Sequence, residues 1–339
     1  MKRRKVRWLL PVTLVLLFAA ACGTRYVLLQ KGKQTLAANA AVQIADEDSQ
    51  RVRYKGKTYS YNKNIITILC MGIDREGFND DGRVAAGQSG QADSLFLAVL
   101  DTRTGEIKLI AISRDTMTDI NVYSDQGNFV GTEKLQLCLA YTYGDGREKS
   151  CENTKKAVSC LFYGIPVHAY MALDLTAIAD LNDVVGGVEV PVTKNLAILD
   201  PSLKEGEKIK LHGEQAQRYV RSRLTEEAQA SADANNDRIE RQKQYLMAFG
   251  AKALASMKKD IRLPFTLYKT VEKSMITDLS VSECVYLGTM AAKSGMKTVE
   301  IQSVPGKSVM GEKYAEFQVD DKKLYEKILD IFYVECDEK

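Results

Sequence analysis

The chain has 339 residues, with 47 Lys and Arg, 44 Asp and Glu and two His, and its formal net charge is +3 at pH 7. With 45% hydrophobic and 27% charged residues it can bury a sizeable core, which excludes a disordered chain, a collagen-like chain and a protein with many membrane spans. Eight basic residues and no acidic residue lie in 1–33, which leaves 39 basic and 44 acidic residues for the remainder. Nucleic-acid-binding domains are usually basic, so we expect no nucleic-acid partner.

The N-terminal segment has the pattern of a membrane anchor. Five basic residues within 1–7 precede an uncharged and mostly apolar run, 8–24. This pattern predicts a cytoplasmic basic segment followed by a single-pass signal-anchor, with the rest of the chain outside the cytoplasmic membrane. The run of 17 residues is close to the lower limit for a spanning helix. Two alternatives stay open: a lipoprotein signal, because an Ala-Ala-Ala-Cys sequence ends at Cys22, and a conventionally cleaved signal.

Three strands are expected after the anchor. Residues 34–60 are polar and aperiodic, which predicts that 25–60 form an extracytoplasmic stalk with a short hairpin near 54–61. The continuous apolar run 65–73 predicts a buried strand. The runs 94–100 and 107–113 predict two further strands that form a hairpin, because the turn sequence DTRTGE separates them.

Helices alternate with strands in the second half of the chain. A helix is expected to begin with Ser150 as its N-cap and to end before Gly164. Apolar stripes and short apolar runs place the later elements: helices at 175–184, from 213, at 237–258, 280–293 and 324–332, strands at 167–173 and 298–304, and a turn and strand at 184–192. This alternation, without an internal repeat, predicts a single α/β domain over 61–335, with a mixed central β-sheet flanked by helices.

The seven Cys and two His residues indicate neither a zinc site nor a disulfide framework. No CxxC sequence occurs, and His168 and His212 are far apart, without a metal-ligand neighbour at helical spacing. Three cysteines in apolar segments are expected to be core thiols: Cys70, Cys138 and Cys284. Cys151 and Cys160 lie in one expected helix, roughly 13 Å apart along its axis, which is too far for a bridge.

Two aspartates flank the first two strands. Asp74 follows 65–73, and Asp93 precedes 94–100. If these strands are antiparallel neighbours, both carboxylates emerge at one edge of the sheet. Hard oxygen ligands without His or Cys favour Mg²⁺ or Mn²⁺ over Zn²⁺, so Asp74 and Asp93 are the candidate metal ligands. The alternative is that Asp93 caps a turn and Asp74 lies in a solvated loop.

Arginines recur at three later places: Arg114 after the third strand, Arg221 and Arg223 at the end of a helix, and Arg238 in the long helix. Arg221 and Arg223 cannot share a helix face, so they converge only if the chain becomes extended there. Arg238 and Gln242 do share a face. Guanidinium forks bind phosphate oxygens in pairs and Mg²⁺ bridges phosphates, so this set predicts a pyrophosphate site; a solvated helix face is the alternative.

Seven motifs, in order, connect these residues to a known family. They read ITILCMGID, GQADSLFLAVLD, LIAISRDTM, KLQLCLAYTYGDG, LNDVVGGVEVPV, LHGEQAQRYVRSR and DRIERQKQYL. Over about 64–249 the chain resembles the LytR–CpsA–Psr (LCP) family of cell-wall polymer transferases, and the expected anchor is consistent with this resemblance. The resemblance implies an LCP-type domain that transfers a glycopolymer from a polyprenyl-pyrophosphate carrier to a muramic acid 6-hydroxyl of peptidoglycan, with the help of Mg²⁺.

The same resemblance implies partners and a location. The expected partners are a polyprenyl-pyrophosphate-linked glycan, such as teichoic acid or capsule polysaccharide, together with peptidoglycan and the cytoplasmic membrane. The protein is expected at the cell membrane, single-pass or lipid-anchored, with its catalytic domain outside.

Individual residues also receive roles from the resemblance. Asp74 and Asp93 match the family's metal-associated aspartates. The residues that match its pyrophosphate-binding positions are Arg114, Arg221, Arg223, Arg238 and Gln242. Catalysis is assigned to Arg114 together with Asp93 and Asp115, the two candidates for the general base at the acceptor hydroxyl. A metal-bound Asp93 is a poor base.

Three positions depart from the family pattern. Gln91 stands where many members have Arg, so one phosphate-binding guanidinium is missing, and Arg75 is the candidate replacement. Ser113 stands where Pro is usual, and Asn235 where an Asp often stands. Because of Gln91, a non-catalytic module that binds or regulates lipid-linked precursors stays open as an alternative function. A hydrolase that cleaves the pyrophosphate with water is a further alternative function.

Two expectations concern the neighbours of the site. Helical spacing sets Arg218 and Arg241 off the proposed site face, so both are expected to be neutral controls. The apolar strands and the turn within 184–192 fit a lipid tunnel and ordinary core packing equally well.

Overall fold

The computed structural model describes residues 24, 26–36, 51–78, 89–174, 176–194, 196–222, 234–260, 262–294 and 299–336. The basic segment 1–7 and all but the last residue of the anchor expected at 8–24 lie outside these ranges. No helix in the described ranges combines the length and the apolar composition needed to cross a membrane.

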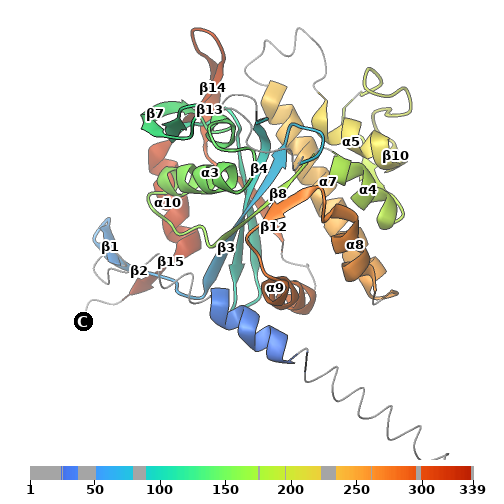
Figure 1. Ribbon diagram of the computed structural model, residues 1–339, viewed down its shortest axis with the longest axis horizontal. Helices are drawn as coiled ribbons and strands as arrows, with labels where there is room; N and C mark the ends of the chain where they lie inside the picture. Colours follow the sequence, from blue (N-terminus) through green and yellow to red (C-terminus); the bar gives the residue numbers. More distant parts are fainter. Residues whose placement is uncertain are drawn as a thin grey trace, which may run out of the picture.

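A six-stranded mixed sheet forms the centre of the domain (Figure 1), in the order β11-β8-β3-β4-β5-β12. Its strands are β3 (Ile65–Ile73), β4 (Ala92–Asp101), β5 (Ile107–Ile112), β8 (Ala169–Leu173), β11 (Met275–Thr277) and β12 (Glu300–Ser303). β4 is antiparallel to both β3 and β5, whereas β8 is parallel to β3 and β12 is parallel to β5. The fold class predicted from the sequence, an α/β domain with a mixed sheet, is confirmed.

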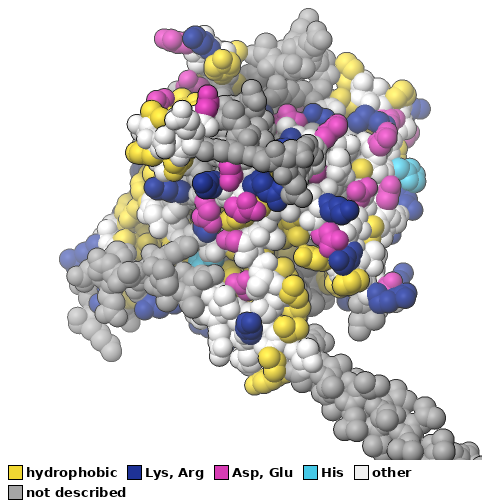
Figure 2. Space-filling model, in the orientation of Figure 1, with side chains coloured by type: hydrophobic (Ala, Val, Ile, Leu, Met, Phe, Trp, Pro, Cys, Tyr) yellow, Lys and Arg dark blue, Asp and Glu magenta, His cyan; other side chains and the backbone are white. Residues whose placement is uncertain are grey.

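Helices cover both faces of this sheet. Their bounds are α2 (Leu139–Thr142), α3 (Glu148–Leu161), α4 (Thr176–Val184), α5 (Gly213–Arg221), α7 (Ala234–Met257), α8 (Leu263–Val271), α9 (Val281–Ser294) and α10 (Asp321–Phe332). Figure 1 shows α3 and α10 on one side of the sheet and α4, α5 and α7 on the other. On the face drawn in Figure 2, Lys and Arg side chains are interspersed with Asp and Glu side chains.

The side chains of β3 alternate between the two faces, which explains why its sequence is apolar throughout. Leu69, Met71 and Ile73 belong to the larger core, which also contains residues of α3 and α10. Cys70 and Gly72 line the opposite face, together with residues of α4 and α7. The strand is therefore buried on both faces, and its end carries the next residue of the chain to the edge of the sheet.

The region expected to be a stalk, 25–60, packs on the domain where the structure describes it. In a helix over 26–36, Leu36 is fully buried and packs with Ile66 and Tyr286 of the domain. β1 (Arg51–Tyr54) and β2 (Lys57–Tyr61) form the expected hairpin, and β2 pairs with the C-terminal strand β15 (Tyr333–Cys336). The polar composition concealed this docking, because a few apolar side chains on one helix face are sufficient for it.

Two further hairpins lie outside the central sheet. They are β6 (Met117–Tyr123) with β7 (Phe129–Gln136), and β13 (Gly306–Met310) with β14 (Ala315–Val319); β9 (Val188–Pro191) pairs with β10 (Lys208–Leu211). A backbone bridge between Thr116 and Phe317 connects β14 to the segment that follows β5. The sequence analysis missed β7 because most of its side chains are exposed and show no alternation of apolar and polar residues.

The start of α3 differs from the prediction. The helix begins at Glu148, and Ser150 is not its N-cap. Asp145 accepts through Oδ1 from the backbone N–H groups of three residues near the helix start, so this carboxylate satisfies the free donors. Asp145 was overlooked because the glycines on either side of it made the segment look like a loop.

Candidate active site

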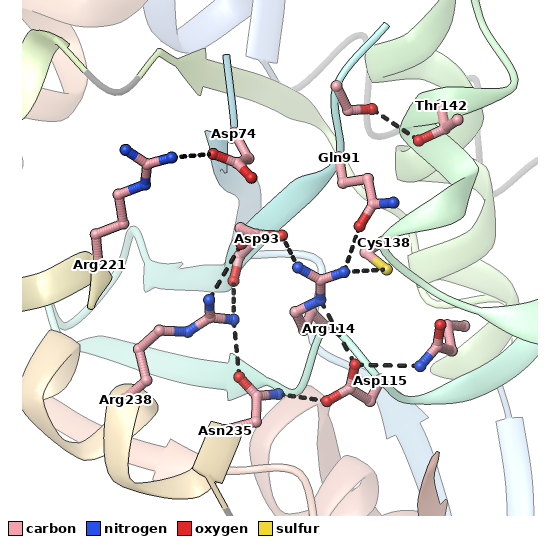
Figure 3. Close-up of polar contacts among 12 residues, drawn as sticks. Asp74, Gln91, Asp93, Arg114, Asp115, Cys138, Thr142, Arg221, Asn235 and Arg238 are labelled. Atoms are coloured by element: carbon pink, nitrogen blue, oxygen red, sulfur yellow. Dashed lines mark hydrogen bonds and ion pairs between the residues drawn. The ribbon is translucent and has the colours of Figure 1, made fainter. Parts of the chain in front are cut away.

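Asp74 and Asp93 emerge at one edge of the central sheet, as the sequence predicts. Asp74 follows β3, Asp93 lies at the start of β4, and the two strands are antiparallel neighbours. The pairing skips Asp93, because Ser94 faces Gly72 and the next paired residue of β4 is Ala92. Such a β-bulge takes one side chain out of the regular alternation. Asp93 thereby belongs to the polar cluster drawn in Figure 3.

Two arginines bind Asp93 from different elements. Arg114, which follows β5, donates from Nη1 to Oδ1 of Asp93. Arg238, in the first turns of α7, donates from Nη1 to Oδ2 (3.1 Å) and from Nη2 to the Asp93 carbonyl oxygen (3.2 Å). The side chain of Arg238 is only 3% exposed, that of Arg114 13% and that of Asp93 17%, so solvent screens these ion pairs little. Asp93 is therefore the shared counter-charge of two guanidinium groups.

The guanidinium of Arg114 has further neighbours besides Asp93. Its Nη2 donates to Oε1 of Gln91 and to Sγ of Cys138 (3.4 Å), and its Nε lies 3.5 Å from Oδ1 of Asp115. Gln91 thus accepts a hydrogen bond that an Arg in its place could not accept. Burial raises the pKa of the Cys138 thiol to about 11, so the sulfur remains protonated. The sequence analysis placed Cys138 in the core, where it lies, but had no signal for its contact with Arg114.

Asp115 is the third carboxylate of the cluster. Its Oδ1 accepts from Nε2 of Gln136 (3.2 Å) and its Oδ2 accepts from Nδ2 of Asn235 (2.9 Å). Both oxygens of Asp93 are engaged as well, by Arg114 and Arg238. In this arrangement each oxygen of the two base candidates already has a donor. Neither Gln136 nor Asn235 was predicted to contact Asp115.

Arg221 lies at the outer side of the cluster. It is the last residue of α5, and the chain is extended at Ser222 (φ −68°, ψ 146°), as the convergence predicted from the sequence required. Its Nη2 donates to Oδ1 of Asp74 (2.9 Å), and the two side chains are 49% and 41% exposed. Arg223 lies outside the described residues.

Arg241 is not a neutral neighbour of the site. Its side chain donates to the backbone carbonyl oxygens of Tyr219 and Ser222, at the end of α5. The residue is 7% exposed, and this burial lowers the pKa of its guanidinium. The expectation that Arg241 is a neutral control is wrong, because the last carbonyl groups of a helix lack intrahelical partners and here they bind this side chain. Arg241 therefore fixes the segment that carries Arg221.

Arg75 and Arg218 are engaged outside the cluster. Nη1 of Arg75 lies 3.5 Å from the carbonyl oxygen of Gly146, and its guanidinium lies 5.7 Å from the centre of the Phe78 ring. Arg75 stays the candidate replacement for the missing family arginine at residue 91, and its guanidinium contacts Gly146 and Phe78 in this structure. Arg218 is half exposed and pairs with Asp200, so it suits its expected use as a control.

Gln242 connects the cluster to an apolar cavity. Its Oε1 accepts from Oγ of Ser94 (3.2 Å), and its Nε2 donates to the carbonyl oxygen of Val220 (3.2 Å). Ser94 and Gln242 also line a cavity of about 250 Å³ between the sheet and helices α4 and α7. The further lining is largely apolar and includes Phe96, Leu173, Leu181, Tyr245, Leu246 and Phe249. Tyr245 and Phe249 continue the helix face of Gln242, as predicted from their spacing.

The donor set of Asp74 and Asp93 fits a hard cation. Within the described ranges, no group of three His, Cys, Asp or Glu residues is arranged to hold a metal ion. Mg²⁺ needs no such group, because in proteins it keeps several waters and binds one or two carboxylates together with substrate phosphates. The two aspartates therefore suit a cation that is held jointly with a phosphate ligand.

Comparison with known proteins connects the whole domain to one family. The LytR_cpsA_psr family model matches residues 26–330. The chain is 26% identical over 265 residues to the polyisoprenyl-teichoic acid–peptidoglycan teichoic acid transferase TagU of Enterococcus faecalis. This match covers 78% of this chain and 77% of that protein. It is 26% identical over 284 residues to TagV of Bacillus subtilis, which carries the same enzyme name; this match covers 79% of the chain and 64% of that longer relative.

A solved structure of TagT bound to LI-WTA has the same fold. The TM-score is 0.58 at 20% sequence identity, and the match covers 80% of this chain and 91% of that chain.

Proposed function

The chain belongs to the LytR_cpsA_psr family, and we propose that it is a phosphotransferase that moves a glycopolymer from a polyprenyl-pyrophosphate carrier to peptidoglycan. The names of TagU and TagV, which describe transfer of teichoic acid from a polyisoprenyl carrier to peptidoglycan, support this proposal. The glycopolymer is a teichoic acid, a capsule polysaccharide or a related glycan.

One observation carries the proposal: Ser94, which follows Asp93 in β4, and Gln242, one turn after Arg238 in α7, both line the apolar cavity, so the arginine–aspartate cluster lies next to it. A polyprenyl pyrophosphate has the two matching parts, an anionic headgroup and an apolar chain. Each charge-assisted hydrogen bond from a guanidinium to a phosphate oxygen is worth roughly 1.5–3 kcal/mol, and the apolar lining offers burial to the first isoprene units. A site for a soluble sugar phosphate would have no use for the apolar cavity.

The proposed roles follow from the contacts. The headgroup ligands are Arg114, Arg221, Arg223, Arg238 and Gln242, and the cation ligands are Asp74 and Asp93. In this structure Asp93 binds Arg114 and Arg238, and Asp74 binds Arg221. Phosphate and carboxylate oxygens make the same kind of contact with a guanidinium, so the headgroup can replace the carboxylates when a cation engages them. Arg75 would have to leave Gly146 to reach the headgroup.

The reaction exchanges one phosphorus–oxygen bond for another. The acceptor hydroxyl oxygen bonds to the phosphorus that carries the glycan, the bond from this phosphorus to the bridging oxygen breaks, and polyprenyl phosphate leaves. Negative charge develops on the bridging oxygen, and Arg114, Arg221 and Arg238 stabilise it because they are oriented before the reaction. Mg²⁺, which Asp74 and Asp93 would hold, would supply further electrostatic stabilisation of the phosphate oxygens. The hydroxyl proton passes to a carboxylate, and Asp115 is the better candidate because it is not a proposed cation ligand.

The proposed location is the outer side of the cytoplasmic membrane. The basic residues of 1–7 before the apolar run 8–24 support this topology, and the carrier lipid resides in the membrane. Protease treatment of intact cells should remove the domain, and protection in intact but not in lysed cells would refute the topology. Incorporation of labelled palmitate that depends on Cys22 would identify a lipoprotein rather than a signal-anchor.

The function is tested with the full chain in detergent and a short lipid-linked glycan, with and without a peptidoglycan oligomer. We expect the glycan to become attached to the oligomer and polyprenyl phosphate to be released only when the oligomer is present. Release without the oligomer would identify a pyrophosphate hydrolase. Binding of the lipid without release in either mixture would identify a non-catalytic module.

A further inference from the structure

Asn235 is only 6% exposed, and its side chain makes three hydrogen bonds inside the cluster. Its Nδ2 donates to Oγ of Ser113 (3.0 Å) and to Oδ2 of Asp115 (2.9 Å), and its Oδ1 accepts from Nη2 of Arg238 (2.8 Å). Figure 3 shows the amide between Asp115 and Arg238. Asn235 lies in the first turn of α7, and its two donor contacts reach the segment that follows β5. One amide therefore connects the two elements that supply these site residues.

The amide of Asn235 is matched to both of its charged partners. The carboxylate of Asp115 needs a donor, the guanidinium of Arg238 needs an acceptor, and an amide supplies both. An Asp at position 235, the residue that family members often carry, would still bind Arg238. It would also place a second carboxylate against Asp115 with no donor between them, and two such carboxylates repel each other.

Ser113 is matched to Asn235. Its buried Oγ accepts from the amide of Asn235 and lies 3.3 Å from the backbone nitrogen of Asp115, which donates to it. A Pro at position 113, the usual residue of the family, has no hydroxyl. One N–H of Asn235 would then be buried without an acceptor, which is unfavourable. Ser113 and Asn235, two departures from the family pattern that are far apart in sequence, are thus in direct contact.

We propose that Ser113 and Asn235 are a matched pair of positioning residues that fix Asp115 and Arg238 relative to each other. One amide therefore fixes the positions of both Asp115, the candidate base, and Arg238, a proposed headgroup ligand. This inference rests on the proposed function for the roles of Asp115 and Arg238. The coupling of the four side chains does not depend on that function, so it can be tested separately.

Side chains from three elements face Asp115 and would surround a new carboxylate at position 235. Among the described residues, Arg114 faces Asp115 from the end of β5, Gln136 from β7 and Asn235 from α7. Cys138 and Asp93 lie beyond the guanidinium of Arg114, and Arg238 lies beyond the amide. A carboxylate introduced at 235 would therefore meet Asp115 as its direct acidic neighbour.

The test is Asn235→Asp in the full chain in detergent, followed by thermal unfolding and by transfer kinetics at pH 7.5 and at pH about 5. At pH 7.5 the two carboxylates repel each other. The variant should therefore unfold at a lower temperature than the wild type, and its rate of glycan transfer should be about tenfold lower. At pH 5 a shared proton restores a donor between the carboxylates, and both defects should shrink. The sign follows from repulsion between the two carboxylates, which would raise the pKa of the pair in the folded variant, so the shared-proton contact is present at low pH and lost as the pH rises.

Two control variants separate positioning from a general loss of packing. Asn235→Ala removes all three hydrogen bonds and takes up no proton, so its defects relative to the wild type should be the same at both pH values. Ser113→Ala combined with Asn235→Ala should lose less than the sum of the two single variants, because each single change removes the same hydrogen bond between the two side chains.

Equal pH dependence of Asn235→Asp and Asn235→Ala, or additive losses in the double variant, would overturn the proposal. Thermal unfolding needs no turnover. If the wild type transfers no glycan, the proposed function fails, and the unfolding data still decide whether the pair is coupled.

Discussion

Asp93 and Arg114 form an ion pair between the adjacent ends of β4 and β5, and the same carboxylate also binds Arg238. Two buried guanidinium groups thus share one carboxylate that sits in a β-bulge, and Arg114 also lies beside Asp115. Loss of the bulge would change the side of the strand on which Asp93 lies, and both guanidinium groups would lose their contact with this carboxylate. The stability of the cluster and its capacity for an anionic ligand therefore depend on the same side chain.

Asp93→Ala is expected to destabilise the fold by about 3–5 kcal/mol, because it removes the carboxylate that binds the buried guanidinium groups of both Arg114 and Arg238. Urea unfolding measures this loss. Asp74→Ala is the matched control: its pair with Arg221 is largely exposed and should contribute less than about 1 kcal/mol. Inorganic pyrophosphate should also raise the melting temperature of Asp93→Ala more than that of the wild type, since it supplies the missing negative charge. Equal losses in the two variants would contradict this account.

Asp74 and Asp93 are expected to bind one divalent cation together with the headgroup. Calorimetric titration with Mg²⁺, in the presence of a pyrophosphate lipid, should show weaker binding for Asp93→Ala and for Asp74→Ala than for the wild type. Asp200→Ala, which changes an aspartate that pairs with Arg218, is the control and should leave binding unchanged. Unaltered binding in both site variants would rule out the assignment.

Arg221→Ala is expected to lower lipid binding or transfer about tenfold or more, because one charge-assisted contact with the headgroup is lost. Arg221→Lys should recover only part of the activity, since it keeps the charge and loses the planar fork. Arg218→Ala removes an exposed Arg of the same helix, paired with Asp200, and should keep full activity. If Arg218→Ala loses activity and Arg221→Ala does not, the assigned register of the site is wrong.

Arg241→Met is expected to act through the end of α5. The variant keeps an apolar stem but leaves the carbonyl oxygens of Tyr219 and Ser222 without their donor, at a cost of about 1.5–3 kcal/mol. Amide hydrogen exchange should become faster in 219–222, and transfer should fall because Arg221 is no longer held in place. Arg221→Ala should reduce transfer without faster exchange, which distinguishes a ligand from the residue that positions it.

His168 is expected to make stability depend on pH in mildly acidic solution. The residue is 2% exposed, burial lowers its pKa to about 4, and its Nδ1 accepts from the backbone N–H of Thr67 (3.0 Å). The unfolded pKa is about 6.5, so the unfolded state binds the proton first and stability falls from pH 6.5 to pH 4, by up to about 3 kcal/mol. In His168→Asn, whose amide oxygen can accept from Thr67, this part of the pH dependence should disappear from urea unfolding curves.

The part of the site that the sequence predicted follows from local rules. The antiparallel pairing of two apolar strands places Asp74 and Asp93 at one edge of the sheet. The helix α5 ends at Arg221, and the backbone becomes extended at Ser222. Arg238 and Gln242 share a helix face. Each of these relationships depends on residues that are close in sequence or on strands joined by one loop. Periodicity and spacing are therefore enough to predict them.

The contacts that the sequence did not predict depend on how distant elements pack. Asn235 reaches Ser113 and Asp115 only because the start of α7 packs against the end of β5. Cys138 lies beside Arg114 because β7 returns to the strand ends. Arg241 shares a helix with Arg238, and spacing alone cannot tell whether its side chain meets solvent or the end of another helix. No single-sequence pattern encodes these approaches.

The small sheet of β1, β2 and β15 decides where the domain can be cut. β2 hydrogen-bonds to β15, and Tyr61 and Tyr333 pack edge to face across this pairing with their ring centres 5.7 Å apart. A fragment that starts at residue 61, the boundary suggested by the sequence, would keep the last strand of the domain and discard its partner. The freed edge of β15 would then be open to pairing with another chain. A soluble fragment for crystals or assays should therefore begin before residue 51 and run to at least residue 336.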